Sequence, residues 1–163
     1  MQTILVVDDM VDVRYLIATV LTKYGFNVRE AATGKLAVQM IAEERPDLVI
    51  CDVNMPAMDG YETLTAVRDS SKTASIPFIL ITGLVSRDGF RRGMSCGADD
   101  YLVKPFTPDE LVDAVMSRLA RQADVQLEAD KRAQKLHEFA AHHNFPELSG
   151  KLEALTGAVV GQS

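Results

Sequence analysis

Three short and almost continuous apolar runs constrain the fold of this chain more than any other feature of its sequence. They cover residues 3–8, 47–51 and 76–81. A strand has an unbroken apolar run when helices cover both faces of its sheet. Between these runs lie segments with apolar residues at helical spacing, for example residues 11–24. This alternation predicts an α/β fold with a parallel sheet that is covered on both faces.

Further elements complete the alternation. Two more strands are expected over 26–31, which is polar enough for a sheet edge, and over 99–103. The remaining helices are expected over about 34–44, 59–69, 86–95 and 108–120. Residues that commonly start or end helices stand at the expected boundaries, namely Gly25, Thr33, Gly97 and Pro108. Five strands and five helices joined by right-handed crossovers predict a doubly wound fold.

Polar side chains gather where the predicted strands end. Asp8 and Asp9 end the first strand, and Asp52, Thr82 and Lys104 end or follow three others. Ligands of doubly wound folds bind at the carboxyl ends of the strands, so these side chains should share one site. Three neighbouring carboxylates repel one another unless a cation or a proton joins them. The cluster therefore predicts a site for Mg²⁺, or for Mn²⁺ in its place, because such ions prefer oxygen ligands.

The same cluster has the parts for phosphoryl transfer. A carboxylate can act as a nucleophile and form an aspartyl phosphate, a role open to Asp52 at the centre of the cluster. Phosphoryl transfer depends mainly on positioning and on neutralising the phosphoryl oxygens. The metal would neutralise one oxygen and Lys104 a second, while the Thr82 hydroxyl and nearby N–H groups would bind the third.

Four motifs, in this order and at this spacing, resemble the receiver domains of bacterial response regulators. The motifs are ILVVDD, CDVNMPAMDG, LITG and GADDYLVKPF, and the resemblance covers roughly residues 3–120. It implies a chemotaxis-receiver-like, flavodoxin-like domain over 1–120, with five helices and the strand order 2-1-3-4-5. A helical extension over 121–163 would follow this domain.

The resemblance also implies roles in phosphate acceptance and metal binding. It identifies Asp52 as the phospho-acceptor and as a metal ligand. Asp9 would bind the metal directly, whereas Asp8 would act largely through water. The backbone carbonyl of Asn54 would complete the protein ligands.

A second set of roles concerns the switch. By resemblance, Thr82 is the hydroxyl that turns toward the phosphoryl group, and Lys104 is the cation that binds it. Tyr101 corresponds to the switch aromatic, which moves inward as Thr82 moves. The peptide bond before Pro105 is expected to be cis, which is rare even before proline.

The implied partners are a cognate histidine kinase or phosphotransfer protein in a phosphorelay. The signalling surface would cover about 86–120, and with the extension about 86–143, for a downstream protein or for self-association. Gly89 and Gly93 weaken the helix within this surface. Two interpretations stay open: the helix is the mobile part of the surface, or its glycine face packs closely against a partner.

Composition limits the other classes of function. The net charge of −6 gives no general attraction to nucleic acid or to an anionic membrane. No apolar run has the length of a membrane span, and the N-terminus lacks a basic leader segment. We therefore expect a cytoplasmic protein with no membrane contact and no direct nucleic-acid contact. Cys51 and Cys96 are interpreted as small apolar packing residues.

The sequence after residue 120 is less informative. Good helix formers over 121–143 indicate that the preceding helix continues, and a second short helix is expected over 147–156. A sparse apolar pattern suits a dimerisation or docking helix. His137 and His142 are five residues apart and so do not match the zinc-protease motif, in which two histidines stand four apart.

Three hypotheses about output remain. In the first, phosphorylation switches a binding module that changes its partner or its dimerisation. In the second, the chain is the receiver and linker of a longer regulator whose further domain is catalytic or binds DNA. In the third, the receiver is degenerate and never takes phosphate. The chain is not expected to be a dedicated enzyme beyond catalysing its own phosphorylation from small phosphodonors and its own dephosphorylation.

Overall fold

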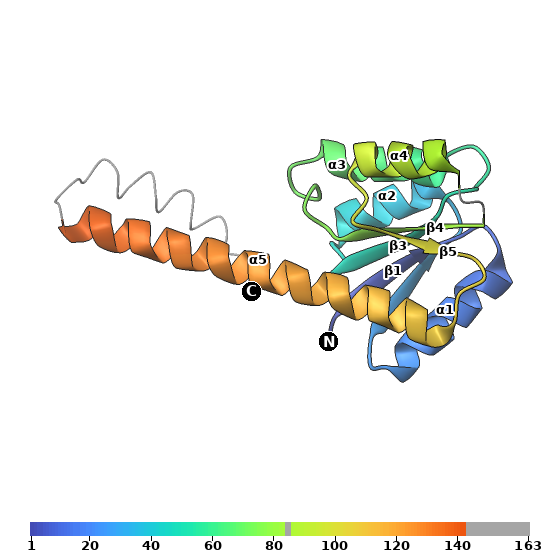
Figure 1. The fold of residues 1–163 in the computed structure, drawn as a ribbon, viewed down its shortest axis with the longest axis horizontal. Coiled ribbons are helices and arrows are strands. Elements are labelled where there is room, and N and C mark those ends of the chain that lie inside the picture. The colour runs from blue at the N-terminus through green and yellow to red at the C-terminus, as the bar shows by residue number, and fades with distance from the viewer. Residues whose placement is uncertain (84–85, 143–163) are drawn as a thin grey trace. The chain divides into compact units, whose positions relative to one another are not determined.

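The computed structural model describes residues 1–83 and 86–142. Its sheet is parallel, and the order of the strands is β2-β1-β3-β4-β5 (Figure 1). The strands are β1 (Thr3–Val7), β2 (Asn27–Ala31), β3 (Leu48–Asp52), β4 (Phe78–Thr82) and β5 (Asp100–Val103). The doubly wound fold and the strand order 2-1-3-4-5 are thus confirmed.

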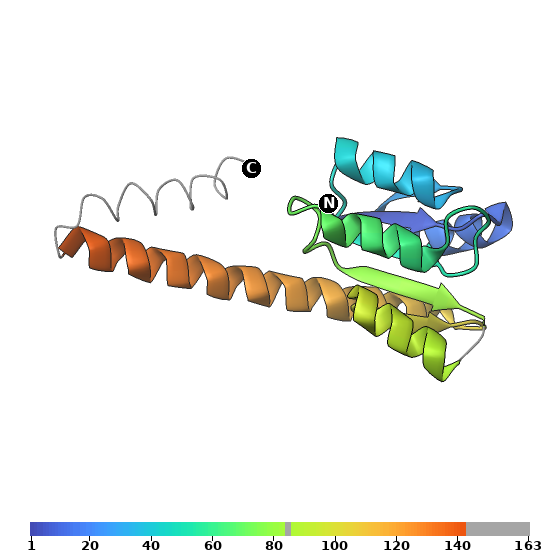
Figure 2. The ribbon, with the colours of Figure 1, turned by 90° about the horizontal axis from the view of Figure 1, so that it is seen from above.

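Five helices alternate with the strands, as predicted. They are α1 (Val11–Lys23), α2 (Gly34–Glu43), α3 (Gly60–Asp69), α4 (Arg87–Cys96) and α5 (Pro108–His142). Figure 2 shows α2, α3 and α4 side by side, and Figure 1 shows that they cover one face of the sheet. α1 and the first turns of α5 cover the other face. Successive strand residues alternate between the two cores, so that Leu5 faces α2 and α3 whereas Ile4 faces α1 and α5.

The strands differ in burial as their positions in the sheet require. Every residue of β3 and of β4 is buried, which explains their unbroken apolar runs. β2 and β5 form the two edges, and their residues are mostly exposed or half-buried. The prediction that residues 26–31 form an edge strand is confirmed.

Two strand ends matter for the site. The strands expected over 47–51 and 76–81 start slightly later, at Leu48 and Phe78, and they end at Asp52 and Thr82, as the sequence indicates. Asp52 pairs with Ile81 of β4, and Thr82 pairs with Val103 of β5. Both side chains are therefore held on paired strands rather than on loops.

Local signals at the helix ends act as the sequence predicts. The Thr33 hydroxyl accepts a hydrogen bond from the Leu36 N–H at 3.1 Å and so caps α2. Gly25 and Gly97 follow α1 and α4 with φ angles of 88° and 90°, a conformation that glycine adopts without strain.

The helix that ends the receiver continues into the extension, as expected. α5 runs from Pro108 to His142, and the chain divides into compact units at Leu119 and Ala120. Exposed polar pairs one turn apart occur along the second part of α5, for example Gln126 and Asp130. The helix predicted over 147–156 and the last position of the predicted helix over 121–143 lie outside the described residues. Within residues 1–83 and 86–142, no helix combines the length and the apolar character needed to cross a bilayer.

Candidate functional site

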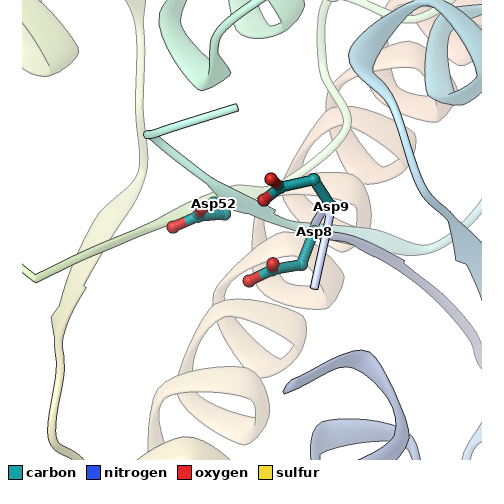
Figure 3. Close-up of side chains that lie close together, drawn as sticks. All are labelled: Asp8, Asp9 and Asp52. Atoms are coloured by element: carbon teal, nitrogen blue, oxygen red, sulfur yellow. The ribbon is translucent and has the colours of Figure 1, made fainter. Parts of the chain in front are cut away.

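Three carboxylates meet at the carboxyl ends of two neighbouring strands. Asp8 and Asp9 follow β1, and Asp52 ends β3, which pairs with β1 in parallel. One oxygen from each carboxylate lies within 4.8 Å of the others, and Figure 3 shows the three side chains together. Asp8 and Asp52 are buried, whereas Asp9 is exposed. An all-oxygen donor set that is open to water on one side fits a hard divalent cation such as Mg²⁺.

Lys104 supplies the positive charge beside these carboxylates. Its Nζ lies 3.2 Å from Asp52 Oδ1 and 3.4 Å from Asp8 Oδ2. Burial and the nearby charge of Asp8 raise the pKa of Asp52, and Lys104 opposes this shift. Burial lowers the pKa of Lys104, but the charges of Asp52 and Asp8 outweigh burial and leave that pKa raised. The lysine is therefore a permanent cation at neutral pH.

The backbone joins Lys104 to the neighbouring strand end. Its N–H donates to the carbonyl oxygen of Thr82 at 2.8 Å, and the Lys104–Pro105 peptide bond is cis. Thr82 is buried at the end of β4. Asn54 lies two residues beyond Asp52, in the segment between β3 and α3, with an exposed side chain.

Gly60 supports β3, the strand that carries Asp52, in a way that the sequence analysis missed. Its N–H donates to the Val53 carbonyl at 2.9 Å, and a Cβ at this position would collide with the backbone of Asp52. α3 begins here, and the Asp59 and Glu62 side chains bond reciprocally to its first turn. Glycine is therefore required at position 60 because its backbone closely approaches that of Asp52, and not only because a loop precedes α3.

Tyr101 is a residue of β5, and its side chain packs against α4 and against a second tyrosine. Its hydroxyl is 2.8 Å from the Gly89 carbonyl oxygen and 2.9 Å from the Tyr61 hydroxyl. The Tyr61 hydroxyl lies 3.0 Å from the same carbonyl. Burial and Tyr61 raise the pKa of Tyr101, so its hydroxyl stays protonated at neutral pH. We refer to Tyr61 and Tyr101 as the tyrosine pair.

The tyrosine pair occupies the glycine face of α4, which one of the two sequence interpretations assigned to a partner. A Cβ at Gly93 would collide with the Tyr101 ring, and one at Gly89 would lie 3.0 Å from the Tyr61 hydroxyl. The glycine face therefore packs against residues of the same chain. The guanidinium of Arg92 lies 4.5 Å from the centre of the Tyr61 ring, although the Arg92 side chain is 56% exposed.

Asp99 and Asp100 each form an ion pair with an arginine that is distant in the sequence. Asp99 accepts hydrogen bonds from Arg68 at 2.9 Å and from the Phe78 N–H at 2.8 Å. Arg68 also donates to the carbonyls of Ile76 and Gly97, so it joins α3 to the segments around α4 and β5. Asp100 pairs with Arg118 of α5 at 3.3 Å. These partners are far apart in sequence, and for that reason the sequence analysis missed them.

The two cysteines are placed as predicted. Cys51 is buried beside Asp52, and burial together with the charge of Asp52 raises the pKa of its thiol. Cys96 is half-buried and packs against the same core. A buried thiol with a raised pKa is a poor nucleophile, so packing accounts for Cys51. The contact of Cys96 with the core is likewise one of packing.

Comparisons with known proteins agree with this geometry. A probable transcriptional regulator ycf27 of Cyanophora paradoxa is 42% identical over 118 residues, which are 72% of this chain and 48% of that protein. The phosphate regulon transcriptional regulatory protein PhoB of Pseudomonas aeruginosa is 35% identical over 128 residues, which are 78% of this chain and 56% of that protein. The chain therefore spans about half the length of these relatives.

Solved structures show the same fold. The chemotaxis protein CheY4 of Vibrio cholerae has a TM-score of 0.70 and 35% identity, and the match covers 72% of this chain and 98% of CheY4. NtrX of Brucella abortus has a TM-score of 0.75 and 28% identity, over 80% of this chain and 30% of NtrX. The family model of the response regulator receiver domain matches residues 4–116. The chain therefore belongs to the response regulator receiver domain family, and the predicted resemblance is confirmed.

Proposed function

We propose that Asp52 accepts a phosphoryl group from a histidine kinase or phosphotransfer protein, in a reaction that requires Mg²⁺. The observation that carries this proposal is the meeting of three carboxylates within 4.8 Å, with the Lys104 ammonium 3.2 Å from the acceptor. Asp8, Asp9, Asp52 and the backbone carbonyl of Asn54 would hold the metal. Mg²⁺ would supply positive charge for the transferring phosphoryl group.

The residues around Asp52 have distinct parts in this reaction. An ionised Asp52 oxygen forms a bond to phosphorus while the bond from phosphorus to the donor breaks. Lys104 lies within reach of Asp52 Oδ1 and favours the ionised, nucleophilic carboxylate. Thr82 ends the strand next to Asp52, from which its hydroxyl can bind the transferred group. Tyr101 would respond to movement of Thr82 as the switch aromatic.

Intact-mass spectrometry of the full chain tests the proposal. Incubation with phosphoramidate and Mg²⁺ should add the mass of one phosphoryl group, and chelation of the metal with EDTA should prevent this. Asp52→Asn should abolish the addition. Asp12→Asn is the matched control, because Asp12 is an exposed carboxylate in the first turn of α1. An unchanged yield in Asp52→Asn would refute the assignment.

The switched output is proposed to involve residues 86–143, through a downstream partner or through self-association. Residues 1–120 would form the receiver, and 121–163 a linker or docking segment. Light scattering with Mg²⁺, with and without beryllofluoride as a mimic of the phosphoryl group, separates these outputs. An increase in particle mass that requires intact Asp52 supports self-association. Beryllofluoride binding without such an increase indicates that the output is contact with a separate partner.

The second candidate is a receiver and linker that belongs to a longer regulator. The observation in its favour is that the chain spans about half of relatives that are named as transcriptional regulators. Another relative is named as the DNA-binding response regulator MtrA. The expectation of no nucleic-acid contact therefore has no support from these relatives. Sequencing the gene past codon 163 tests this candidate, because an in-frame DNA-binding or catalytic domain would establish it.

We infer that the chain acts in signalling rather than as a dedicated enzyme, because it matches the receiver family and is similar to transcriptional regulators. Its covalent chemistry would be confined to its own phosphorylation and dephosphorylation. We propose a cytoplasmic location, where histidine kinases present their phosphoryl groups.

A further inference from the structure

Arg14 of α1 holds the backbone of the segment that carries two of the carboxylates. Its Nη1 donates to the carbonyl oxygen of Asp8 at 2.7 Å. Its Nε lies 3.4 Å from Glu30 Oε1 on β2, and only 15% of the Arg14 side chain is exposed. The guanidinium therefore joins the edge strand β2 to the start of the segment between β1 and α1.

The Asp8 carbonyl belongs to the peptide unit that joins Asp8 to Asp9. Because a peptide unit is planar, a hydrogen bond to this carbonyl restrains the orientation of both residues. The Asp8 N–H donates to the Ala31 carbonyl at 3.2 Å, and Asp8 Oδ1 accepts from the Met10 N–H at 2.9 Å. These two contacts hold Asp8 itself. Within the described residues, the Arg14 contact is the hydrogen bond that restrains the Asp8–Asp9 link.

We propose that Arg14 is a positioning residue for the divalent cation. It fixes the Asp8–Asp9 peptide so that both carboxylates are presented to the space beside Asp52. This inference rests on the proposed function, because it concerns the same metal site. Groups that orient metal ligands without touching the metal typically change metal affinity by tenfold or more when they are lost.

An electrostatic role and a positioning role of Arg14 predict opposite changes in Mg²⁺ affinity when Arg14 is replaced. A guanidinium beside a cation site repels the cation, so loss of its charge alone should strengthen Mg²⁺ binding. Loss of the hydrogen bond to Asp8 should weaken Mg²⁺ binding, because the ligands are no longer held in place. The sign of the change therefore separates a positioning role from an electrostatic one.

Calorimetric titration of the full chain with Mg²⁺ provides the test. Arg14→Met keeps an apolar side chain of similar length and removes both polar contacts. We expect it to weaken Mg²⁺ binding by about tenfold. Arg14→Lys keeps the charge but cannot contact Asp8 and Glu30 at the same time, so we expect an intermediate loss of Mg²⁺ affinity. Glu30→Gln leaves the Asp8 contact and should cause the smallest loss.

Arg29 provides a matched control. It lies on β2, next to Glu30 in the sequence, its side chain is 20% exposed, and it pairs with Glu44 at 3.5 Å. Its guanidinium donates to the carbonyls of Met40 and Glu44 at the end of α2, rather than to the acidic segment. Arg29→Met should therefore lose similar packing and leave Mg²⁺ affinity unchanged.

The possible outcomes separate failure of this inference from failure of the proposed function. Weaker binding in Arg14→Met, with Arg29→Met unchanged, supports the positioning role. Equal or tighter binding in Arg14→Met overturns it, while the function stands if Asp52→Asn still abolishes binding. A wild-type chain that does not bind Mg²⁺ overturns both. If Arg14→Met does not fold, the same comparison is made with Arg14→Lys, whose unchanged affinity would overturn the inference.

Discussion

The acidic site and the α4 face are built in contrasting ways. The site stands on β1, β3 and β4, and Asp8 and Asp52 are themselves buried. In α4, Gly93 is the one buried residue, and β5 has none. The contrast shows that the proposed acceptor Asp52 stands on the core, whereas the proposed signalling surface stands on an edge of the sheet.

The α4 face depends on a few polar contacts. Toward its start, the tyrosine pair bonds to the Gly89 carbonyl, and at its end Arg68 bonds to the Gly97 carbonyl. Two of its large apolar side chains, Phe90 and Met94, are 52% and 50% exposed. Regions with few buried apolar contacts open locally at a lower free-energy cost than the core. We therefore expect α4 to open more readily than the core, as the proposed transmission of a signal from Asp52 to this helix requires.

The largest effect should follow a change at Gly60, where backbone meets backbone. Gly60→Ala places a Cβ against Asp52, and neither backbone can move freely because β3 is a buried inner strand. We expect the free energy of unfolding to fall by about 3 kcal/mol. Urea denaturation measures this change. A smaller loss of unfolding free energy than in Gly93→Ala would contradict the account in which the acidic site is the more rigid of the two regions.

A smaller effect is expected at Gly93, where the neighbour is a side chain. Gly93→Ala should drive the Tyr101 ring outward rather than distort the sheet. Alanine favours the helix over glycine by about 1 kcal/mol, which offsets part of the cost of the collision. The net loss of stability should therefore be about 1 kcal/mol. The NMR chemical shifts of the Tyr101 ring and the exchange rate of its hydroxyl proton report the position of this side chain. Retention of the wild-type ring environment would show that α4 yields instead.

Removal of one hydroxyl from the tyrosine pair should have a still milder effect. Tyr61→Phe loses the contacts to Gly89 and Tyr101 and keeps the ring beneath Arg92. We expect stability to fall by less than about 1 kcal/mol, and exchange of the α4 amides to quicken. Tyr15→Phe is a suitable control, because Tyr15 is 71% exposed on α1. Equal exchange of α4 in both variants would contradict a role for the pair.

The smallest effect is a pH-dependent change in the metal-free chain. The pKa of Asp52 is raised by burial and by Asp8, so its ionisation destabilises the folded state. Asp52→Asn removes this cost and should raise the melting temperature at neutral pH in EDTA. The gain should shrink as the pH falls through the raised pKa toward the unfolded value of about 3.9. A gain that grows on acidification would contradict the predicted sign.

The periodicity of the sequence was sufficient to predict the elements and the order of the layers. The acidic cluster follows from the rule that parallel strands end at one edge of the sheet, which predicts that Asp8, Asp9 and Asp52 lie together. The contacts of Gly60 and Gly93 were not predicted, because a one-dimensional pattern does not show which backbone or ring a glycine approaches.

Contacts between distant segments were the part that sequence could not supply. Arg14 meets Asp8 and Glu30, and Arg68 meets Asp99, because helices dock on the sheet at particular rotations. Nothing in the local spacing of these charges distinguishes them from solvated ones. A useful signal would be an arginine on the apolar side of a helix, because a guanidinium there requires partners.

Segment-resolved hydrogen exchange of the full chain, with Mg²⁺ and with or without beryllofluoride, tests the central claim most directly. A receiver whose acceptor is fixed on the core and whose signal is read at the edge should change its exchange mainly over residues 86–106. β1 and β3 should change little, and Asp52→Asn should show no response. Exchange over α4 that is as slow as in the core and unaltered by beryllofluoride, or a response that persists without Asp52, would contradict the account.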